Sequence, residues 1–246
     1  MAVKNIPIIE LGGRGADELR SPISQALSDL GFVALRGHGI DAALVSEVYR
    51  VVRAFFALPA DTKLRYHLPD GAGARGYTPF GIEKAKDQTV ADLKEFWHVG
   101  RELPESERQA AQLPPNVWPD EIPGFREATL ALWRALDALG SRVLSAVALG
   151  LQQDARYFDR VIDRGNSILR PLCYPPIASA PAGAVRSAAH EDINLITLLV
   201  GSAEPGLQIL ARDGVGVDAR SGEGLGGGTG GVRSGGGRCG VLASGG

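Results

Sequence analysis

A run of apolar residues at helical spacing, between residues 124 and 151, limits the folds open to this chain. Leucine, valine and aromatic side chains recur every three or four positions, so they form one wide stripe on a helix. A helix of this kind is stable when its stripe is buried, and we expect it to serve as a scaffold against a sheet. The stripe consists of Phe125, Leu132, Trp133, Leu136, Leu139, Val143, Leu144 and Val147.

The order of the other elements predicts an α+β fold. Helices are expected at residues 19–30 and 41–55, where Gly31 can cap the first and Asp41 can N-cap the second. Residues 68–92 are rich in glycine and predict a loop. Most strands come late in the chain, so helices and strands are segregated rather than alternating. The expected strands are residues 6–11, 32–35, 93–99, 167–174, 195–200, 206–210 and 215–217, with a hairpin turn at residues 213–214.

Composition limits the environment and the partners. The chain has 246 residues, 44% of them hydrophobic, and a net charge of −2, which allows one large domain or two small ones and gives no field that favours nucleic acid or an anionic membrane. Cys173 and Cys239 are too few and too far apart for a disulfide framework or a zinc pattern. Residues 1–7 lack an apolar signal core, and no apolar run reaches membrane-spanning length. We therefore expect a cytoplasmic protein without nucleic-acid or membrane partners.

The last 27 residues differ sharply from the rest. Residues 220–246 contain 13 of the 33 glycines and no aromatic residue. A segment of this composition buries too little apolar surface to offset the entropy lost on ordering. The sequence therefore predicts a disordered tail at residues 220–246.

The candidate chemical centre is the pair His190 and Asp192, which precedes the apolar residues 195–200. Residues two apart in an extended chain point to the same side, so the imidazole and the carboxylate can converge on one metal ion. Such a pair is two thirds of the two-His-one-carboxylate triad of non-haem iron sites. The alternative is a histidine and an aspartate on the rim of a strand with no metal role, because a pair this short also occurs by chance.

Eight motifs, this pair included, occur in one consistent order. They are Ile6-Pro7-Ile8-Ile9, Gly31-Phe32 through Gly37-His38-Gly39-Ile40, Phe55-Phe56-Ala57-Leu58-Pro59, Arg75-Gly76-Tyr77, Lys94-Glu95, Asn116-Val117-Trp118-Pro119, the segment 170–176 ending in Tyr174-Pro175-Pro176, and His190-Glu191-Asp192. With these motifs, residues 6 to about 217 resemble the isopenicillin N synthase-like family of Fe(II)- and 2-oxoglutarate-dependent oxygenases.

The resemblance implies a double-stranded β-helix (jelly roll) with N-terminal helices packed outside. It implies that His190 and Asp192 ligate Fe(II), and that Tyr174 helps to hold 2-oxoglutarate; the family usually has asparagine where this chain has Leu172. The implied reaction uses molecular oxygen and decarboxylates 2-oxoglutarate, coupled to hydroxylation, desaturation or cyclisation of a small molecule, or to ethylene formation. The implied divisions are an N-terminal region 1–110, a scaffold helix with the first half of the jelly roll at 111–219, and the tail 220–246.

Other polar residues have a structural and a functional interpretation. His98, beside Trp97, is either packed at a strand edge or part of a substrate pocket. Arg75, in the glycine-rich loop, is either structural or contacts an acidic group of a substrate. His38 and His67 are interpreted as structural and surface residues, and Cys173 as a small core residue.

The pattern of the family breaks off before the third iron ligand. The resemblance requires a second histidine fifty to sixty residues after the aspartate, then an Arg-x-Ser for 2-oxoglutarate, whereas no histidine follows His190. Because an out-of-frame reading of a GC-rich gene yields mainly glycine, arginine and alanine, we interpret the change between Val215 and Arg220 as a frameshift. The sequence thus predicts an incomplete barrel. Three alternatives follow: an oxygenase by lineage, a truncated and inactive product of such an enzyme, or a binding module with a glycine-rich tail.

Overall fold

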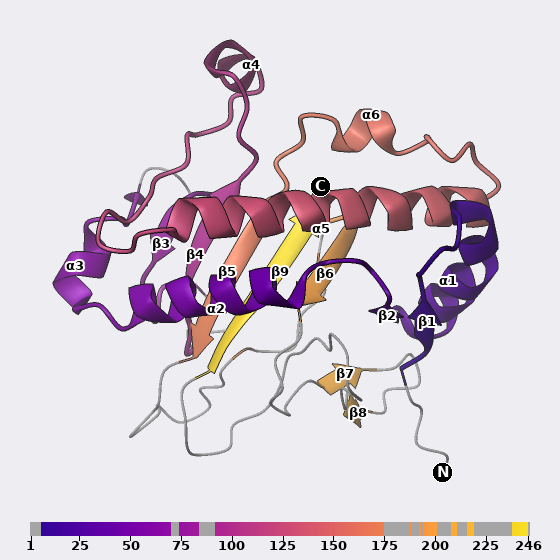
Figure 1. Ribbon diagram of the computed structural model, residues 1–246, viewed down its shortest axis with the longest axis horizontal. Coiled ribbons are helices and arrows are strands. Elements are labelled where there is room, and N and C mark those ends of the chain that lie inside the picture. Colours follow the sequence, from indigo (N-terminus) through magenta and orange to yellow (C-terminus); the bar gives the residue numbers. More distant parts are fainter. Residues whose placement is uncertain are drawn as a thin grey trace.

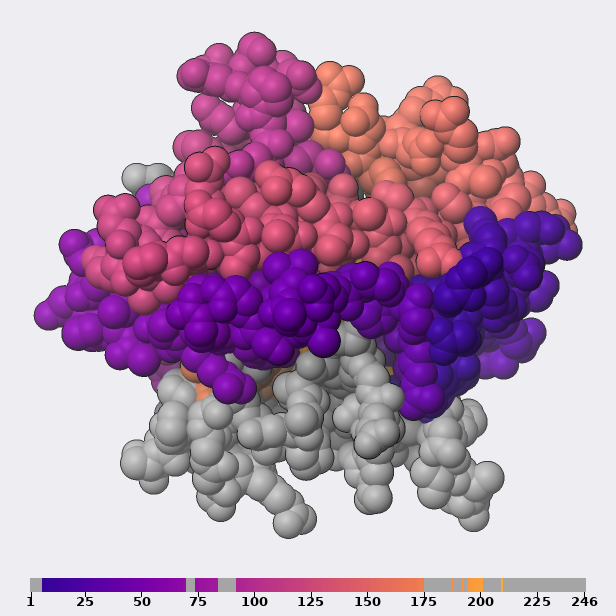
Figure 2. All heavy atoms as spheres, in the orientation of Figure 1, coloured from indigo at the N-terminus to yellow at the C-terminus, as the bar shows by residue number. Residues whose placement is uncertain are grey.

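A layer of helices lies across one face of a five-stranded sheet (Figure 1). The computed structural model describes residues 6–69, 74–83, 92–174, 187, 192, 194–200, 208–210, 216–218 and 238–245. Helices α2 (Ala42–Phe56) and α5 (Phe125–Gly150) run next to each other over the sheet. Figure 2 shows the side chains of these two helices forming one continuous layer.

Helix α5 is the scaffold that the apolar stripe predicted. It spans 26 residues, within one residue of the expected bounds at each end. Leu132 and Leu136 enter a core cluster shared with α2 and the sheet, whereas Leu139 and Val143 enter a second cluster shared with α1 (Ala16–Leu30). One long helix therefore contributes to both of these core clusters.

The two N-terminal helices have the predicted caps. Gly31 follows α1 with φ 77°, a left-handed conformation that glycine adopts without a steric penalty. The Asp41 side chain accepts a hydrogen bond from the Ala43 amide at 2.8 Å at the start of α2. Both caps confirm the prediction from sequence.

Short elements surround this framework. Strands β1 (Ile8–Glu10) and β2 (Ala34–Arg36) form a parallel pair beside α1, and α3 (Ala60–Leu64) follows α2. Helices α4 (Glu105–Ala110) and α6 (Asp159–Ile162) lie on the outer side of α5 in Figure 1. The sequence did not predict α4 and α6, because helices this short carry no periodic apolar signal.

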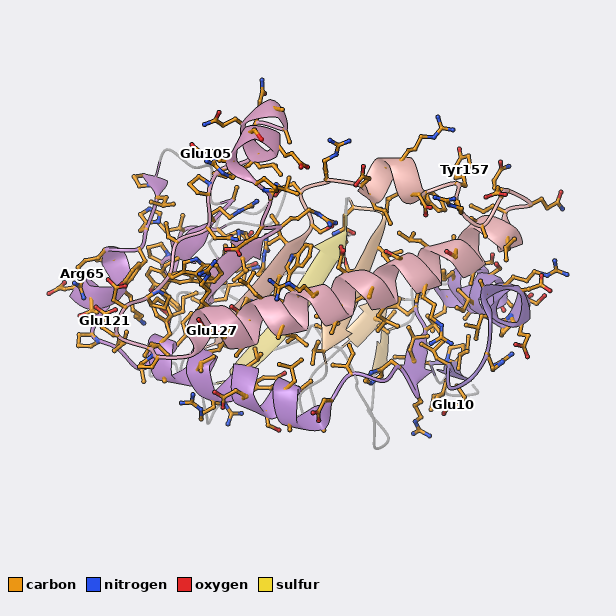
Figure 3. The ribbon with its side chains drawn as sticks, turned by 45° about the horizontal axis from the view of Figure 1, so that its top comes forward. Glu10, Arg65, Glu105, Glu121, Glu127 and Tyr157 are labelled. Carbon is orange, nitrogen blue, oxygen red and sulfur yellow. The ribbon has the colours of Figure 1, made fainter. Side chains whose placement is uncertain are left out.

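The end of the molecule near α3 is fixed by a polar contact to the segment before α5. The Tyr66 hydroxyl donates to Glu121 Oε2 at 2.7 Å and accepts from the Asp120 amide at 3.0 Å. Arg65 forms an ion pair with the same glutamate, and Figure 3 shows both charged residues at this end of the molecule. These bonds hold the entry to α5 against the first half of the chain.

The main sheet has the order β3-β4-β5-β9-β6, and all neighbouring strands are antiparallel. Its strands are β3 (Gly76–Thr78), β4 (Glu95–Gly100), β5 (Ile168–Tyr174), β6 (Ile196–Val200) and β9 (Arg238–Gly245). Strand β3 falls inside the segment predicted to be loop. The sheet combines strands from both sides of the division expected at residue 110, and that division stays a prediction.

A separate hairpin consists of β7 (Gln208–Leu210) and β8 (Gly216–Asp218), which pair antiparallel. It confirms the strand pair expected on either side of residues 213–214, although that turn lies outside the described residues. Ile209 is 2% exposed, so the hairpin contributes at least one side chain to the interior.

Strand β9 corrects the expectation of a disordered tail. Arg238–Gly245 lies between β5 and β6 and pairs with both along its length, from Ile168–Ser244 to Tyr174–Arg238 on one side and from Ile196–Gly245 to Val200–Val241 on the other. A strand needs backbone partners more than large side chains, and two neighbouring edges supply them here. Residues 220–237 and 246, the rest of the expected tail, lie outside the described residues.

Candidate functional site

The main sheet has two faces of different chemistry. Trp97, Val99 and Leu169 point into the core beneath α2 and α5. Side chains alternate along a strand, so Phe96, His98, Arg170 and Tyr174 belong to the opposite face, which we call the inner face. The register supports this assignment, because Phe96 lies opposite Leu172 and Val99 opposite Leu169.

Arg170 is the centre of a polar network on the inner face. Its Nε donates to His98 Nε2 at 2.6 Å, its Nη1 contacts Glu83 at 3.3 Å, and its guanidinium lies 4.7 Å from the centre of the Phe96 ring. Because His98 Nε2 accepts this bond, the imidazole carries no proton on that nitrogen. His98 is 5% exposed and therefore has a fixed orientation on the inner face.

Lys94 forms the second part of the network. Its ammonium lies 2.7 Å from Glu83 and 2.9 Å from Asp92, and both Lys94 and Asp92 are buried. Burial lowers the pKa of Lys94, but the two carboxylates outweigh it and raise the pKa above the ordinary value. Lys94 is thus a permanent cation at neutral pH, shared between two anions.

Tyr174, the expected 2-oxoglutarate contact, is the last residue of β5 and lies at the Lys94 end of the inner face. Burial raises the pKa of its phenol, while the charge of Lys94 and a hydrogen bond with Ser187 act in the opposite direction. The net effect keeps the phenol protonated at neutral pH, so its hydroxyl can donate a hydrogen bond to an anion.

A second buried ion pair lies on the helix-facing side of the sheet. Lys63 contacts Glu95 Oε2 at 2.7 Å and the Phe56 carbonyl at 3.1 Å, and the Tyr77 hydroxyl donates to the same Glu95 oxygen at 2.5 Å. Burial and this glutamate raise the pKa of Tyr77. Every charged group here is paired within the core, which indicates a structural role.

The candidate metal ligands are only partly described. His190 lies outside the described residues, and Asp192 is exposed. Within the described part of the chain, no three His, Cys, Asp or Glu residues form a cluster that could hold a metal ion. Imidazole and carboxylate are donor types that suit Fe(II). The pair supplies two of the three ligands of a facial triad, and the given sequence has no histidine after His190.

Sequence reasoning missed most of the inner-face network. Glu83 and Asp92 lie within the segment 68–92 that was predicted as a loop, and Arg170 was assigned only to a strand. The available signal was the alternation of Lys94, Phe96 and His98 with Glu95, Trp97 and Val99, which places polar groups on both faces of β4. Only the pairing of β4 with β5 brings Arg170 to His98.

Comparisons with known proteins give the class of this chain. A family model described as "non-haem dioxygenase in morphine synthesis N-terminal" matches residues 6–121. A 2-oxoglutarate-dependent dioxygenase from Didymella fabae is 31% identical over 219 residues, covering 84% of this chain and 65% of the relative. One from Aspergillus rugulosus is 31% identical, covering 85% of this chain and 67% of the relative. The chain thus spans about two thirds of the length of these curated relatives.

Solved structures agree with this class. A 2OG-Fe(II) oxygenase family protein from Caulobacter crescentus is 35% identical with a TM-score of 0.84, over 97% of this chain and 86% of that one. A full-length Neurospora crassa protein, solved in complex with alpha-KG, is 29% identical with a TM-score of 0.76, over 98% of this chain and 73% of that one. The chain belongs to the 2-oxoglutarate- and Fe(II)-dependent dioxygenase family.

This membership confirms the predicted fold, an α+β chain with helices outside an incomplete jelly roll. The structural neighbours are jelly-roll oxygenases, and the described residues form helices and open sheets without a closed barrel. Among the described helices, none is both long and apolar enough to cross a membrane.

Proposed function

We propose that the protein acts as an Fe(II)- and 2-oxoglutarate-dependent oxygenase on a small molecule. In this reaction, oxidative decarboxylation of 2-oxoglutarate is coupled to hydroxylation, desaturation or cyclisation at a C–H bond, or yields ethylene and succinate. The observation that carries the proposal is the 35% identity over nearly the whole chain to a 2OG-Fe(II) oxygenase family protein. Molecular oxygen is the other reactant. A cytoplasmic location, and the lack of nucleic-acid and membrane partners, stay predictions.

The proposed site residues are His190 and Asp192 for the metal and Tyr174 for 2-oxoglutarate. Bound iron would supply the oxygen chemistry. Tyr174, kept protonated by burial, donates its hydroxyl hydrogen to a carboxylate of the cosubstrate. Lys94 and His98, which are buried, and the half-buried Arg170 form an internally paired lining that fixes the polar groups of the inner face in place.

A second candidate is a catalytically inactive member of the family. The observation that favours it is that the sequence has no histidine after His190 and no Arg-x-Ser after Asp192. Loss of an outer-shell partner weakens metal binding by roughly 10–100-fold, and loss of a direct metal ligand should weaken iron binding by more than that.

Anaerobic titration with Fe(II) and then 2-oxoglutarate separates the two candidates. An active oxygenase develops the weak visible charge-transfer band of the chelated cosubstrate and releases succinate once air is admitted. Asp192→Asn should abolish both signals, whereas Asp163→Asn, at an exposed surface carboxylate, should retain them. Absence of the band and of succinate in the unmodified chain would leave the inactive member as the function.

Tyr174→Phe tests the cosubstrate contact. Losing one hydrogen bond to a charged group costs about 1.5–3 kcal/mol, so we expect the dissociation constant of 2-oxoglutarate to rise roughly 10–100-fold. Iron binding without cosubstrate should stay unchanged. An unaltered dissociation constant for 2-oxoglutarate would remove Tyr174 from the site.

A further inference from the structure

Arg75 is enclosed by the protein at the far end of the inner face from Tyr174. Its residue surface is 1% exposed. A side chain added at Gly100 would place its Cβ 1.9 Å from Arg75 Cζ, so the guanidinium fills the space that this glycine leaves open. Gly100 lies on the same face of β4 as His98 and Phe96, because the three residues are spaced two apart. Arg75, which fills the space over Gly100, therefore lies on the inner face rather than in the helix-facing core.

The backbone at Gly76 directs Arg75 to this position. Gly76 has φ +73°, and a Cβ there would lie 2.6 Å from the Tyr66 carbonyl and 2.9 Å from a Val117 methyl. Only glycine tolerates both the left-handed backbone and the lack of space. The left-handed backbone at Gly76, the first residue of β3, interrupts the regular strand geometry and lets the side chain of Arg75 reach across to Gly100.

The hydrogen bonds of Arg75 leave one edge of its guanidinium unused. Nη1 donates to the Ala74 carbonyl at 2.6 Å, whereas Nε and Nη2 are buried and have no hydrogen-bond partner among the described residues. The hydrogens of Nε and Nη2 point in parallel from the same edge of the plane. Two parallel donors of this kind match the two oxygens of a carboxylate.

Three other cations in or beside the sheet differ from Arg75: Lys63 and Lys94 are buried, and Arg170 is half-buried. Lys63 pairs with Glu95, Lys94 with Glu83 and Asp92, and Arg170 with Glu83 and His98. For Arg75, burial lowers the pKa, and no carboxylate of the described residues compensates for it. An uncompensated buried charge is strongly destabilising, so an unpaired guanidinium inside a protein indicates a binding role.

We propose that Arg75 binds the carboxylate of a small carboxylic acid through its Nε–Nη2 edge, and that this acid is the substrate to be oxidised. The assignment as substrate rests on the proposed oxygenase function; the assignment of an anion site does not. Gly100 lies opposite Ile168 at one end of β5, and Tyr174 is the other end. At 3.3 Å per residue these ends are about 20 Å apart. One 2-oxoglutarate molecule held at Tyr174 is too short to reach Arg75, so the acid at Arg75 is a separate ligand.

Thermal unfolding of the metal-free protein, in EDTA, tests the anion site without any turnover. The probes are succinate, benzoate, 2-oxoglutarate and inorganic phosphate at equal ionic strength, with benzamide as the neutral counterpart of benzoate. We expect at least one of the two plain carboxylates to raise Tm by several degrees and benzamide to leave it unchanged. Stabilisation by phosphate alone, or equally by benzamide, would overturn the proposal.

Arg75→Met, Arg75→Lys and the surface control Arg126→Met assign the effect to this side chain. Without ligand, Arg75→Met should have the same Tm as the unmodified protein or a higher one, because it removes an unpaired buried charge; a structural arginine would instead lower Tm. The carboxylate-induced rise should vanish in Arg75→Met, shrink in Arg75→Lys, which lacks the two-donor edge, and persist in Arg126→Met. A rise that survives in Arg75→Met contradicts the proposal.

The same variants separate this site from the oxygenase function. In the anaerobic Fe(II) titration, Arg75→Met should bind 2-oxoglutarate as the unmodified protein does. If the unmodified protein shows an Arg75-dependent rise in Tm but forms no charge-transfer band, the anion site stands and the oxygenase function fails. If 2-oxoglutarate is the only acid whose stabilisation depends on Arg75, the assignment of this site to a separate substrate is wrong.

Discussion

At the scale of single residues, the ion-pair and hydrogen-bond partners of a charged side chain can lie near in the sequence or far away. Lys94 has its counterions nearby in sequence at Glu83 and Asp92, but Arg170 reaches His98 across 72 residues. The local sequence therefore does not predict which of these cations will form an ion pair. Lys94 is paired with two carboxylates, whereas Nε and Nη2 of Arg75 have no partner among the described residues, and this contrast appears only once β3, β4 and β5 are aligned.

Three tyrosines, one of them buried and two half-buried, predict sensitivity to alkali. Burial raises the pKa of Tyr66, Tyr77 and Tyr174 above the ordinary value of about 10. A tyrosine that holds its proton more tightly in the folded state adds stability that is complete below pH ~10 and is lost as the pH rises further. Spectrophotometric titration at 295 nm, followed together with circular dichroism, should show these phenols ionising only as the protein unfolds. Ionisation of all five tyrosines near pH 10 with native circular dichroism would contradict this prediction.

At the scale of elements, α5 contains two glycines in opposite surroundings. A Cβ at Gly140 would have its nearest contacts at 3.7 Å, an ordinary van der Waals distance, from Ile196 and Leu198. The same position lines a cavity of about 40 Å³ between α5 and the sheet. At Gly150, a Cβ would lie 1.8 Å from Ser24 Oγ. The first site has room for a methyl group and the second does not.

Gly140→Ala should therefore stabilise the protein, by about 0.5–1 kcal/mol from helix propensity alone. Gly150→Ala is the matched control on the same helix and should be destabilising, because the new Cβ would lie 1.8 Å from Oγ and 3.0 Å from Cβ of Ser24, which must shift. Urea unfolding of the two variants measures both free energies. A loss of stability in Gly140→Ala would show that the cavity beside α5 is smaller than its lining residues indicate.

Strand β9 is the element on which the main sheet depends. It separates β5 from β6, so its backbone groups satisfy two edges at once. Val241→Pro removes an amide from the middle of this strand, and a proline in a central strand breaks the ladder on either side. We expect a loss of at least about 3 kcal/mol in unfolding free energy, and aggregation through the exposed edges.

Val241→Thr, which keeps a β-branched residue, is the control. Light scattering should give this variant the same molecular mass as the unmodified chain. A protein with Val241→Pro that melts at the same temperature as the unmodified chain would show that β9 does not stabilise the sheet.

At the scale of the whole molecule, two compositions share one chain. Residues 6 to about 217 carry the motifs of an oxygenase, while residues 220–246 contain 13 of the 33 glycines. Reading the coding DNA in the other two frames, downstream of Val215, should yield a histidine followed by Arg-x-Ser. In a chain that carries this segment in place of residues 219–246, the dissociation constant for Fe(II) should fall by more than the roughly 10–100-fold that an outer-shell partner contributes. Isothermal titration under anaerobic conditions measures this change. A histidine missing from both frames would reject the frameshift.

The sequence by itself determined the elements whose signal is local. The apolar stripe defined α5, Gly31 and Asp41 marked the ends of their helices, and the ordered motifs identified the family. Tertiary structure alone decided the features that join distant segments: β9 between β5 and β6, the inner-face network around Arg170, and the unused edge of Arg75 over Gly100. The physical reason is that helix periodicity and caps arise from neighbours within a few residues, whereas strand partners and the pairing of buried charges depend on segments that meet only after folding.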